Sequence, residues 1–330
     1  MKSILKKVSG VALAALLALG MIGCSSGSDD PIMPPVSGKQ TVATPAFSVA
    51  SGAVDSGTEL TITCATDDAE IYYTTDGSEP TASSTEYTAA ISVTTAVTLK
   101  AIAVKDGMNN SSVASASYLI IPTKATCVPG DFVLKDGTML PKDISLTDTQ
   151  KSNVAAVIVR AAADGKPALG VGIVQNKMAW CTESAAGYEI DISALVGDET
   201  SGYMDGRDGW DKLKAACSDA ESSPENYPAW NYSLTYAETN GLTGDLAEGW
   251  YLPTVAELYT IYQNKTVVDA SLLKAGGSQF GTSWYWSCCQ YPSLVKYALV
   301  LNFTNGSMDR FNKVSKYDGY DGVCSVRAFN

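Results

Sequence analysis

The chain has 330 residues, with 23 lysines and arginines against 35 aspartates and glutamates, and it contains no histidine. The missing imidazole excludes a Ser-His-Asp triad, a Cys-His dyad, a histidine-ligated zinc and a haem with a proximal histidine. The net charge of −12 argues against nucleic acid and anionic membrane surfaces as partners, and the length favours two domains.

The N-terminus has the pattern of an export signal. Lysines at positions 2, 6 and 7 precede an apolar run over residues 11–19, which is too short to span a bilayer. The run ends in MIGC, which resembles the lipobox of bacterial lipoproteins. This resemblance implies a lipoprotein signal peptide over residues 1–23, lipidation of Cys24, and anchoring to the bacterial cell envelope at the outer membrane or cell surface. The alternative is an ordinary signal peptide with an incidental cysteine.

Residues 24–42 have too few large apolar side chains to fold, so they predict a flexible stalk. Without the leader the charge becomes −15, from 20 basic and 35 acidic residues. If Cys24 carries the lipid, seven of the eight cysteines remain, so at least one thiol is unpaired. Cys64 is the strongest candidate because TITCA alternates as a strand does. The connectivity of the others stays open: Cys127, Cys181, Cys217, Cys288, Cys289 and Cys324.

Short β-rich runs about ten residues apart fill residues 43–121, as in an antiparallel sandwich. Asp-Gly pairs at 76–77 and 106–107 predict tight turns. The strings IYYTTDGSEPT and LKAIAVKDG resemble the chitobiase/β-hexosaminidase C-terminal module, which implies an immunoglobulin-like β-sandwich. In hexosaminidases a separate barrel carries the chemistry, so we expect a spacer here.

Residues 127–330 mix strands and helices. NVAAVIVRAA and ALGVGIVQ flank Asp164-Gly165 and predict a buried hairpin. An apolar stripe predicts a helix over residues 209–220, formed by Trp210, Leu213, Ala216 and Cys217. Thr254 and Glu257 form a capping box that predicts a second short helix. Further strands follow, with a turn at Asn305-Gly306.

GWYLPTVAEL, YWS, NFTNG and VRAF together resemble the Lcl C-terminal family of bacterial domains, which is related to the C-type lectin fold. The predicted fold class is therefore an all-β immunoglobulin-like sandwich followed by an α+β C-type-lectin-like domain with two short helices. The large apolar residues of these motifs predict a core: Trp250, Leu252, Trp286, Phe303 and Val326.

The sequence predicts no metal, no cofactor and no catalytic residue. The Glu-Pro-Asn and Trp-Asn-Asp signatures of calcium-binding lectins are missing, and Asp208 and Asp211 favour a helix N-terminus instead. The adjacent Cys288 and Cys289 bring to mind formylglycine-generating enzymes, which have the same broad fold but place their cysteines apart. Without a basic neighbour to lower a thiol pKa, a thiol oxidase is the minority interpretation.

Two aperiodic loops near the C-terminus have the Tyr, Asn, Ser and Asp composition of a binding surface on a rigid scaffold. The predicted ligand-binding residues are Gln290, Tyr291, Lys296, Tyr297, Arg310, Asn312, Lys316, Tyr317, Asp318 and Tyr320. Related C-terminal domains are targets of diversity-generating retroelements, so these loops are candidates for diversification; ordinary polar loops are the alternative.

The predicted function is a lipid-anchored envelope protein that presents a ligand-binding, adhesive domain, with a glycan or a surface protein of a host or neighbouring cell as partner. The alternatives are a structural envelope lipoprotein without a dedicated ligand and, last, the thiol oxidase. The family resemblance is the only source of the glycan partner.

Replacing the predicted lipidation site tests the anchor. We expect Cys24→Ser to move the protein from the detergent phase to the aqueous phase, because the acyl chains supply the membrane affinity. Detergent partitioning of labelled wild-type and variant protein measures this. Equal partitioning of the two proteins would contradict a lipid on Cys24.

Overall fold

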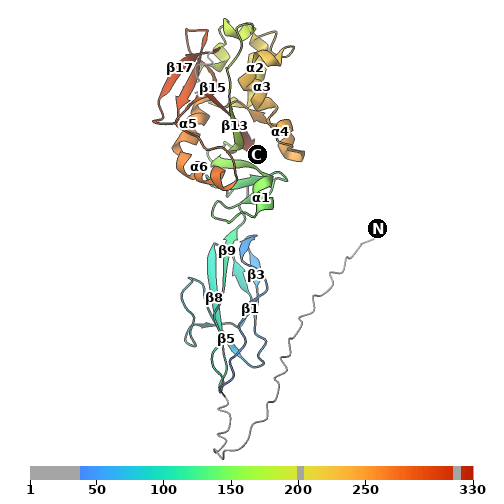
Figure 1. The fold of residues 1–330 in the computed structure, drawn as a ribbon, viewed down its shortest axis with the longest axis vertical. Helices are drawn as coiled ribbons and strands as arrows, with labels where there is room; N and C mark the ends of the chain where they lie inside the picture. Colours follow the sequence, from blue (N-terminus) through green and yellow to red (C-terminus); the bar gives the residue numbers. More distant parts are fainter. Residues whose placement is uncertain (1–37, 199–203, 315–320, 330) are drawn as a thin grey trace, which may run out of the picture. The chain divides into compact units, whose positions relative to one another are not determined.

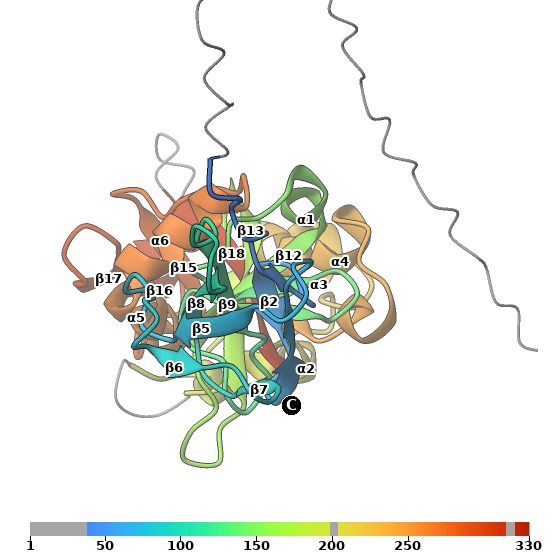
Figure 2. The same cartoon turned by 90° about the horizontal axis from the view of Figure 1, so that it is seen from below.

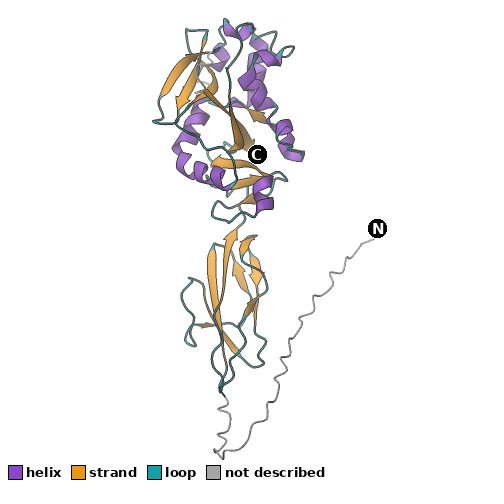
Figure 3. Ribbon diagram, in the orientation of Figure 1, coloured by secondary structure: helices purple, strands orange, loops and turns teal. Residues whose placement is uncertain are grey.

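The structure is a computed structural model that describes residues 38–198, 204–314 and 321–329. It consists mostly of β-strands with a few short helices (Figure 3). Within the described residues, every α-helix follows residue 147. The predicted signal peptide, Cys24 and most of the stalk lie outside the described residues. No helix within the described part is long and apolar enough to cross a membrane. The division at about residues 122–126 stays a prediction.

Residues 46–120 form short strands consistent with a β-sandwich, and their pairing is antiparallel except between β2 and β9, which are parallel. A five-stranded sheet has the order β2-β9-β8-β5-β6, of which β5, β6 and β8 are seen side by side in Figure 2, and two further strand pairs are β1-β4 and β3-β7. The strands are β1 Ala46–Phe47, β2 Gly52–Val54, β3 Thr58–Leu60, β4 Ile62–Thr63, β5 Glu70–Thr74, β6 Thr85–Glu86, β7 Ile91–Val93, β8 Val97–Val104 and β9 Ala114–Ile120.

The sandwich encloses a small core in which Leu60 and Leu99 are fully buried beside Tyr118. Both predicted Asp-Gly turns have the expected backbone, with φ of 78° at Gly77 and 80° at Gly107. These left-handed conformations favour glycine, so the turns that set the strand order are encoded locally.

The C-terminal residues form a nine-stranded sheet (Figure 1). Its order is β11-β10-β12-β13-β18-β15-β16-β17, and β14 also pairs with β18. The strands are β10 Phe132–Leu134, β11 Met139–Leu140, β12 Val154–Arg160, β13 Ala168–Lys177, β14 Trp250–Tyr251, β15 Trp284–Gln290, β16 Tyr297–Asn302, β17 Met308–Asn312 and β18 Asp321–Phe329.

The last strand lies inside this sheet. β18 is antiparallel to β13 along seven residue pairs and parallel to β15, where Tyr285 pairs with Gly322. The predicted hairpin of β12 and β13 is confirmed: φ is 53° at Asp164 and 73° at Gly165. β12 and the first half of β13 are buried as predicted, whereas the second half of β13 is half-buried or exposed. Hairpin and C-terminal strand thus form one continuous layer.

The prediction of two short helices is wrong, because the described residues contain six α-helices. They are α1 Asp148–Asn153, α2 Gly209–Ala216, α3 Pro228–Leu234, α4 Tyr236–Thr239, α5 Val255–Gln263 and α6 Lys265–Lys274. Single 3-10 turns are η1 Ala186–Tyr188, η2 Ser193–Leu195, η3 Gly206–Asp208, η4 Pro224–Asn226 and η5 Gly244–Ala247. Most of the missed helices are one or two turns long, which is too short for a helical periodicity to appear in sequence.

The two predicted helices exist with adjusted bounds. α2 ends at Ala216, four residues early, and Ala216 is exposed although Leu213 and Cys217 are buried as expected. α5 begins at the predicted capping box, in which Thr254 and Glu257 satisfy each other's backbone N–H groups. α5 packs on β12, β15 and β16, while α3 packs on β14 and β18.

The predicted framework residues are core residues. Trp286 and Val326 are fully buried, and Trp250, Leu252 and Phe303 are at most 3% exposed. The Trp286 indole N–H donates to the Met178 carbonyl at 2.9 Å, so the ring is both packed and hydrogen-bonded. All seven described cysteines are thiols, and only Cys64, which follows β4, is not buried.

Truncating this buried indole should unfold the domain. We expect Trp286→Ala to lower the free energy of unfolding by about 3 to 5 kcal/mol, because it leaves a large cavity and an unpaired carbonyl. Tryptophan fluorescence during denaturant unfolding measures this domain, since all six tryptophans lie between residues 180 and 286. Tyr291→Ala is the matched control, and an equal loss in both variants would contradict a surface position for Tyr291.

Candidate functional site

An irregularity in β15 sets the course of the first predicted binding loop. Trp286 pairs with Val300 but Gln290 pairs with Ala298, so β15 holds two extra residues there. Within this bulge the Cys288 N–H leaves the ladder and donates to the Pro253 carbonyl at 2.7 Å. Bulges re-aim the chain that follows them, here the loop 291–296.

Gln290 is buried, which corrects its predicted role as a surface contact. Only 1% of the residue is exposed. Its side-chain oxygen accepts hydrogen bonds from the Ile192 N–H at 2.9 Å and from the Lys313 ammonium at 3.3 Å. The residue therefore joins the sheet to the segment after η1 and offers no free surface to a ligand.

Lys296 lies on the surface beside η1. Its ammonium forms an ion pair with Glu189 at 2.6 Å and lies 4.9 Å from the centre of the Tyr188 ring. The Glu189 hydrogen bond raises the pKa of Lys296 above its usual value. No pattern in the sequence predicts that Tyr188 and Glu189 contact Lys296, because more than 100 residues separate them from it.

Arg310 and Asn312 lie on β17 and make two further contacts, one with Tyr291 and one with Tyr188. The Arg310 guanidinium lies 4.8 Å from the centre of the Tyr291 ring, and the Asn312 amide donates to the Tyr188 hydroxyl at 3.3 Å. Tyr297 pairs with Asn312 across β16 and β17, and its carbonyl accepts from the Tyr291 N–H at 3.0 Å.

These residues form one surface, which we call the Tyr-cation patch. Its members come from η1 and the residue after it, from the β15–β16 loop and from the facing ends of β16 and β17: Tyr188, Glu189, Tyr291, Lys296, Tyr297, Arg310 and Asn312. The structure thus brings together five of the ten predicted residues and adds two. Lys316, Tyr317, Asp318 and Tyr320 lie outside the described residues.

The two cations of the patch differ in their partners. Lys296 is neutralised by Glu189, whereas Arg310 is exposed and forms no ion pair with a carboxylate in the described part of the chain. Stacking on Tyr291 holds the guanidinium plane while its N–H donors remain available. The patch can therefore offer one pre-oriented cation among three half-buried tyrosines.

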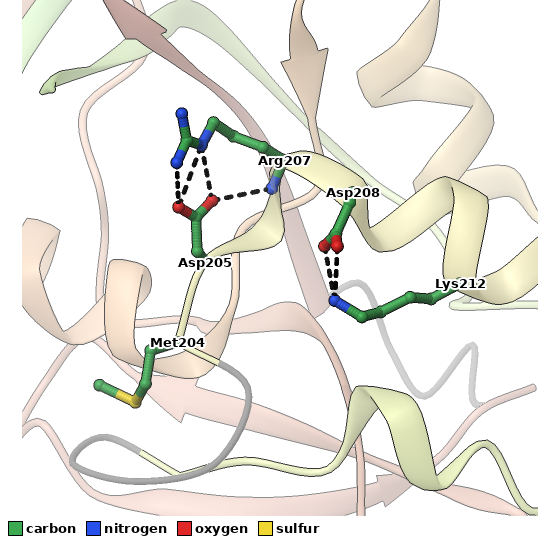
Figure 4. A pocket seen from close by; sticks show the side chains of 5 residues that line it. All are labelled: Met204, Asp205, Arg207, Asp208 and Lys212. Atoms are coloured by element: carbon green, nitrogen blue, oxygen red, sulfur yellow. Dashed lines mark hydrogen bonds and ion pairs between the residues drawn. The ribbon is translucent and has the colours of Figure 1, made fainter. Parts of the chain in front are cut away.

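A second candidate is an open recess of about 470 Å³ beside η3 and α2 (Figure 4). The Asp205 carboxylate forms an ion pair with the Arg207 guanidinium at 2.6 Å, and the Asp208 carboxylate forms one with the Lys212 ammonium at 2.7 Å. Dashed lines mark both pairs in Figure 4. The four charged side chains among the described lining residues are thus paired with one another, two by two.

Glu257 is a buried carboxyl next to this recess. It accepts from the Tyr251 hydroxyl at 2.7 Å, the Thr254 N–H at 2.9 Å and the Gly206 N–H at 3.3 Å. Burial raises the pKa of Glu257 above its usual value. Perturbed carboxyls mark active sites in many enzymes, but these bonds use Glu257 to cap α5 and to hold η3.

The thiols have the electrostatics of buried structural cysteines. Burial raises the pKa of Cys181 to about 12 and that of Cys288 well above the ordinary value. Such thiols stay protonated near neutral pH and are poor nucleophiles. Among the described residues, no group of three or more Cys, Asp or Glu side chains is arranged to hold a metal ion.

Comparison with protein families identifies one module. Residues 49–115 match the model of the chitobiase/beta-hexosaminidase C-terminal domain, as the DGSEPT motif predicted. That domain is a non-catalytic part of those enzymes, and the match does not show whether this chain is an enzyme. No curated protein sequence matches the chain.

The buried thiols predict a loss of stability at alkaline pH. The Cys181 thiol ionises near pH 9 when unfolded but only near 12 when folded, so its contribution is complete below pH 9 and is lost as the pH rises towards 12. At about 1.4 kcal/mol per pH unit above 9, we expect the wild type to lose roughly 2 kcal/mol more stability than Cys181→Ala between pH 7 and 10.5, measured by fluorescence-detected unfolding. Cys64→Ala is the control, and parallel curves for Cys181→Ala and wild type would refute the assignment.

Proposed function

We propose that the chain is a lipid-anchored protein of the bacterial cell envelope that binds a ligand through the Tyr-cation patch. In this proposal, the MIGC junction supplies the anchor, residues 24–42 a stalk, and the sandwich an immunoglobulin-like spacer. The C-terminal residues form a C-type-lectin-like binding domain, as their motifs imply.

The arrangement of Arg310 is the observation that carries the proposal. This exposed guanidinium is stacked on Tyr291 and lacks a carboxylate partner among the described residues, although the chain is strongly acidic. A protein of this charge has many carboxylates that can neutralise a surface arginine. An arginine that is held in place without one is suited to an anionic or hydrogen-bond-accepting group of a ligand.

The surrounding side chains favour an adhesive surface over an enclosed active site. Tyrosines supply contact area at a low cost in conformational entropy, and Asn312 supplies hydrogen-bonding groups. A glycan or a protein on a host or neighbouring cell presents both kinds of complementary group. Binding through a few exposed side chains also suits diversified loops, although Cys288 and Cys289 are buried and would not be part of a variable surface.

Binding assays with patch variants test the proposal. The full chain carrying Cys24→Ser would be applied to glycan arrays and to intact bacterial and host cells. We expect Arg310→Ala and Tyr291→Ala to weaken the binding so detected by about 1 to 4 kcal/mol each while leaving the unfolding free energy nearly unchanged, because central contacts dominate binding.

Arg207→Ala is the matched control, since it removes an exposed arginine from the recess of Figure 4. It should leave binding unchanged. Loss of binding in Arg207→Ala but not in Arg310→Ala would move the site to the recess. Absence of binding to every array and cell would leave a structural envelope protein as the better description.

A further inference from the structure

Lys313 is a lysine in the interior of the C-terminal domain. It is completely buried, directly after β17. Its ammonium donates to the Gly187 carbonyl at 2.7 Å and to the Gln290 side-chain oxygen at 3.3 Å. The same ammonium lies 4.7 Å from the centre of the Trp180 ring, and it forms no ion pair with a described carboxylate.

The groups that face this ammonium do not neutralise it. Its nearest titratable neighbours are the thiols of Cys181 and Cys217 and the exposed carboxyl of Asp191. Burial lowers the pKa of Lys313 to about 8, which expresses the cost of holding the charge away from water. An apolar side chain of similar volume would avoid this cost.

The contacts of Lys313 lie next to the Tyr-cation patch. Gly187 precedes Tyr188, and Gln290 precedes Tyr291. Lys313 itself follows Asn312, and its backbone N–H donates to the Lys296 carbonyl at 2.9 Å. The side chain and the backbone of Lys313 therefore form hydrogen bonds beside patch residues of the η1 segment and the β15–β16 loop, while Lys313 itself follows the patch residue Asn312 of β17.

Gln290 extends this set of contacts. Its oxygen accepts from both the Lys313 ammonium and the Ile192 N–H, so the segment from Gly187 to Ile192 is fixed at both ends. That segment carries Tyr188 and Glu189, which lie more than 100 residues before β17 in the sequence. Two surface contacts also join this segment to the neighbouring chain: the Lys296–Glu189 ion pair reaches the β15–β16 loop, and the Asn312–Tyr188 hydrogen bond reaches β17.

We propose that Lys313 is a positioning residue of the Tyr-cation patch, whose ammonium holds the η1 segment and the β15–β16 loop together at the expense of stability. The inference rests on the proposed function of the patch. It concerns the order of the patch, however, which can be measured without a ligand.

Hydrogen–deuterium exchange of the full chain carrying Cys24→Ser provides that measurement. Lys313→Met shortens the unbranched side chain by one atom and removes the charge and the donors. In this variant we expect exchange to accelerate about ten-fold or more in peptides covering 186–192 and 291–296. The melting temperature should stay unchanged or rise, because an uncompensated buried charge is removed. Peptides covering β8 in the sandwich should exchange as in the wild type.

Two further variants keep the test decisive. Lys313→Arg retains a cation and its donors and should restore much of the protection. Gln290→Leu removes the shared acceptor and should accelerate exchange at Ile192, even if Lys313→Met does not fold.

Unchanged exchange in both peptides of Lys313→Met would overturn the proposal. It would also be overturned if exchange rose uniformly over the C-terminal domain with a lower melting temperature, since Lys313 would then support only the fold. If the local effect is found but no array or cell is bound, the proposed function fails and the positioning role stands.

Discussion

The C-terminal domain depends on the pairing of β18 with strands on both of its sides. β13 and β15 do not pair with each other, and β18 is antiparallel to one and parallel to the other. Removing β18 would leave a four-stranded piece, β11-β10-β12-β13, and a three-stranded piece, β15-β16-β17, each with a new edge of unpaired backbone groups. Trp250 and Tyr251 of β14 also pair with β18, and α3 packs on both strands, so this helix is fixed to the same strand.

The alternation of side chains along β17 places its packing residue and its proposed binding residue on opposite faces of the strand. Phe311 packs against the rings of Trp284 and Trp286, which anchors the strand to β15. Its neighbour Arg310 faces the Tyr291 side and is exposed. Consecutive side chains of a strand point to opposite faces. Phe311, which packs on β15, and Arg310, which is proposed to bind, are therefore adjacent in sequence but lie on opposite faces of β17.

Much of the fold could be predicted from local patterns. The Asp164-Gly165 turn between two apolar runs and the Thr254–Glu257 capping box each encode their structure within a few residues. The GWYLP and YWS aromatic residues are buried as their motifs implied. Helices of one or two turns, such as α4, could not be predicted, because four residues carry no readable period.

The candidate site could be predicted only in part, for a different reason. The loops after β15 and around β17 were recognisable from composition, but Tyr188 and Glu189 join them through contacts across more than 100 residues. Gln290 ends a run of buried residues in β15, and Lys313 lies between the half-buried Asn312 and Val314. The two side chains hydrogen-bond to each other in the interior, and no periodicity in the sequence marks either polar residue as buried. Such pairings are properties of the tertiary structure alone.

The central place of β18 also sets the order of folding during synthesis. The sandwich strands are complete at residue 120, so that module can fold while the rest of the chain is still being made. The nine-stranded sheet cannot close until residues 321–329 emerge, roughly 10 to 40 s later at about 5–20 residues per second. A nascent chain therefore carries a folded β-sandwich module followed by a long segment whose sheet cannot yet close.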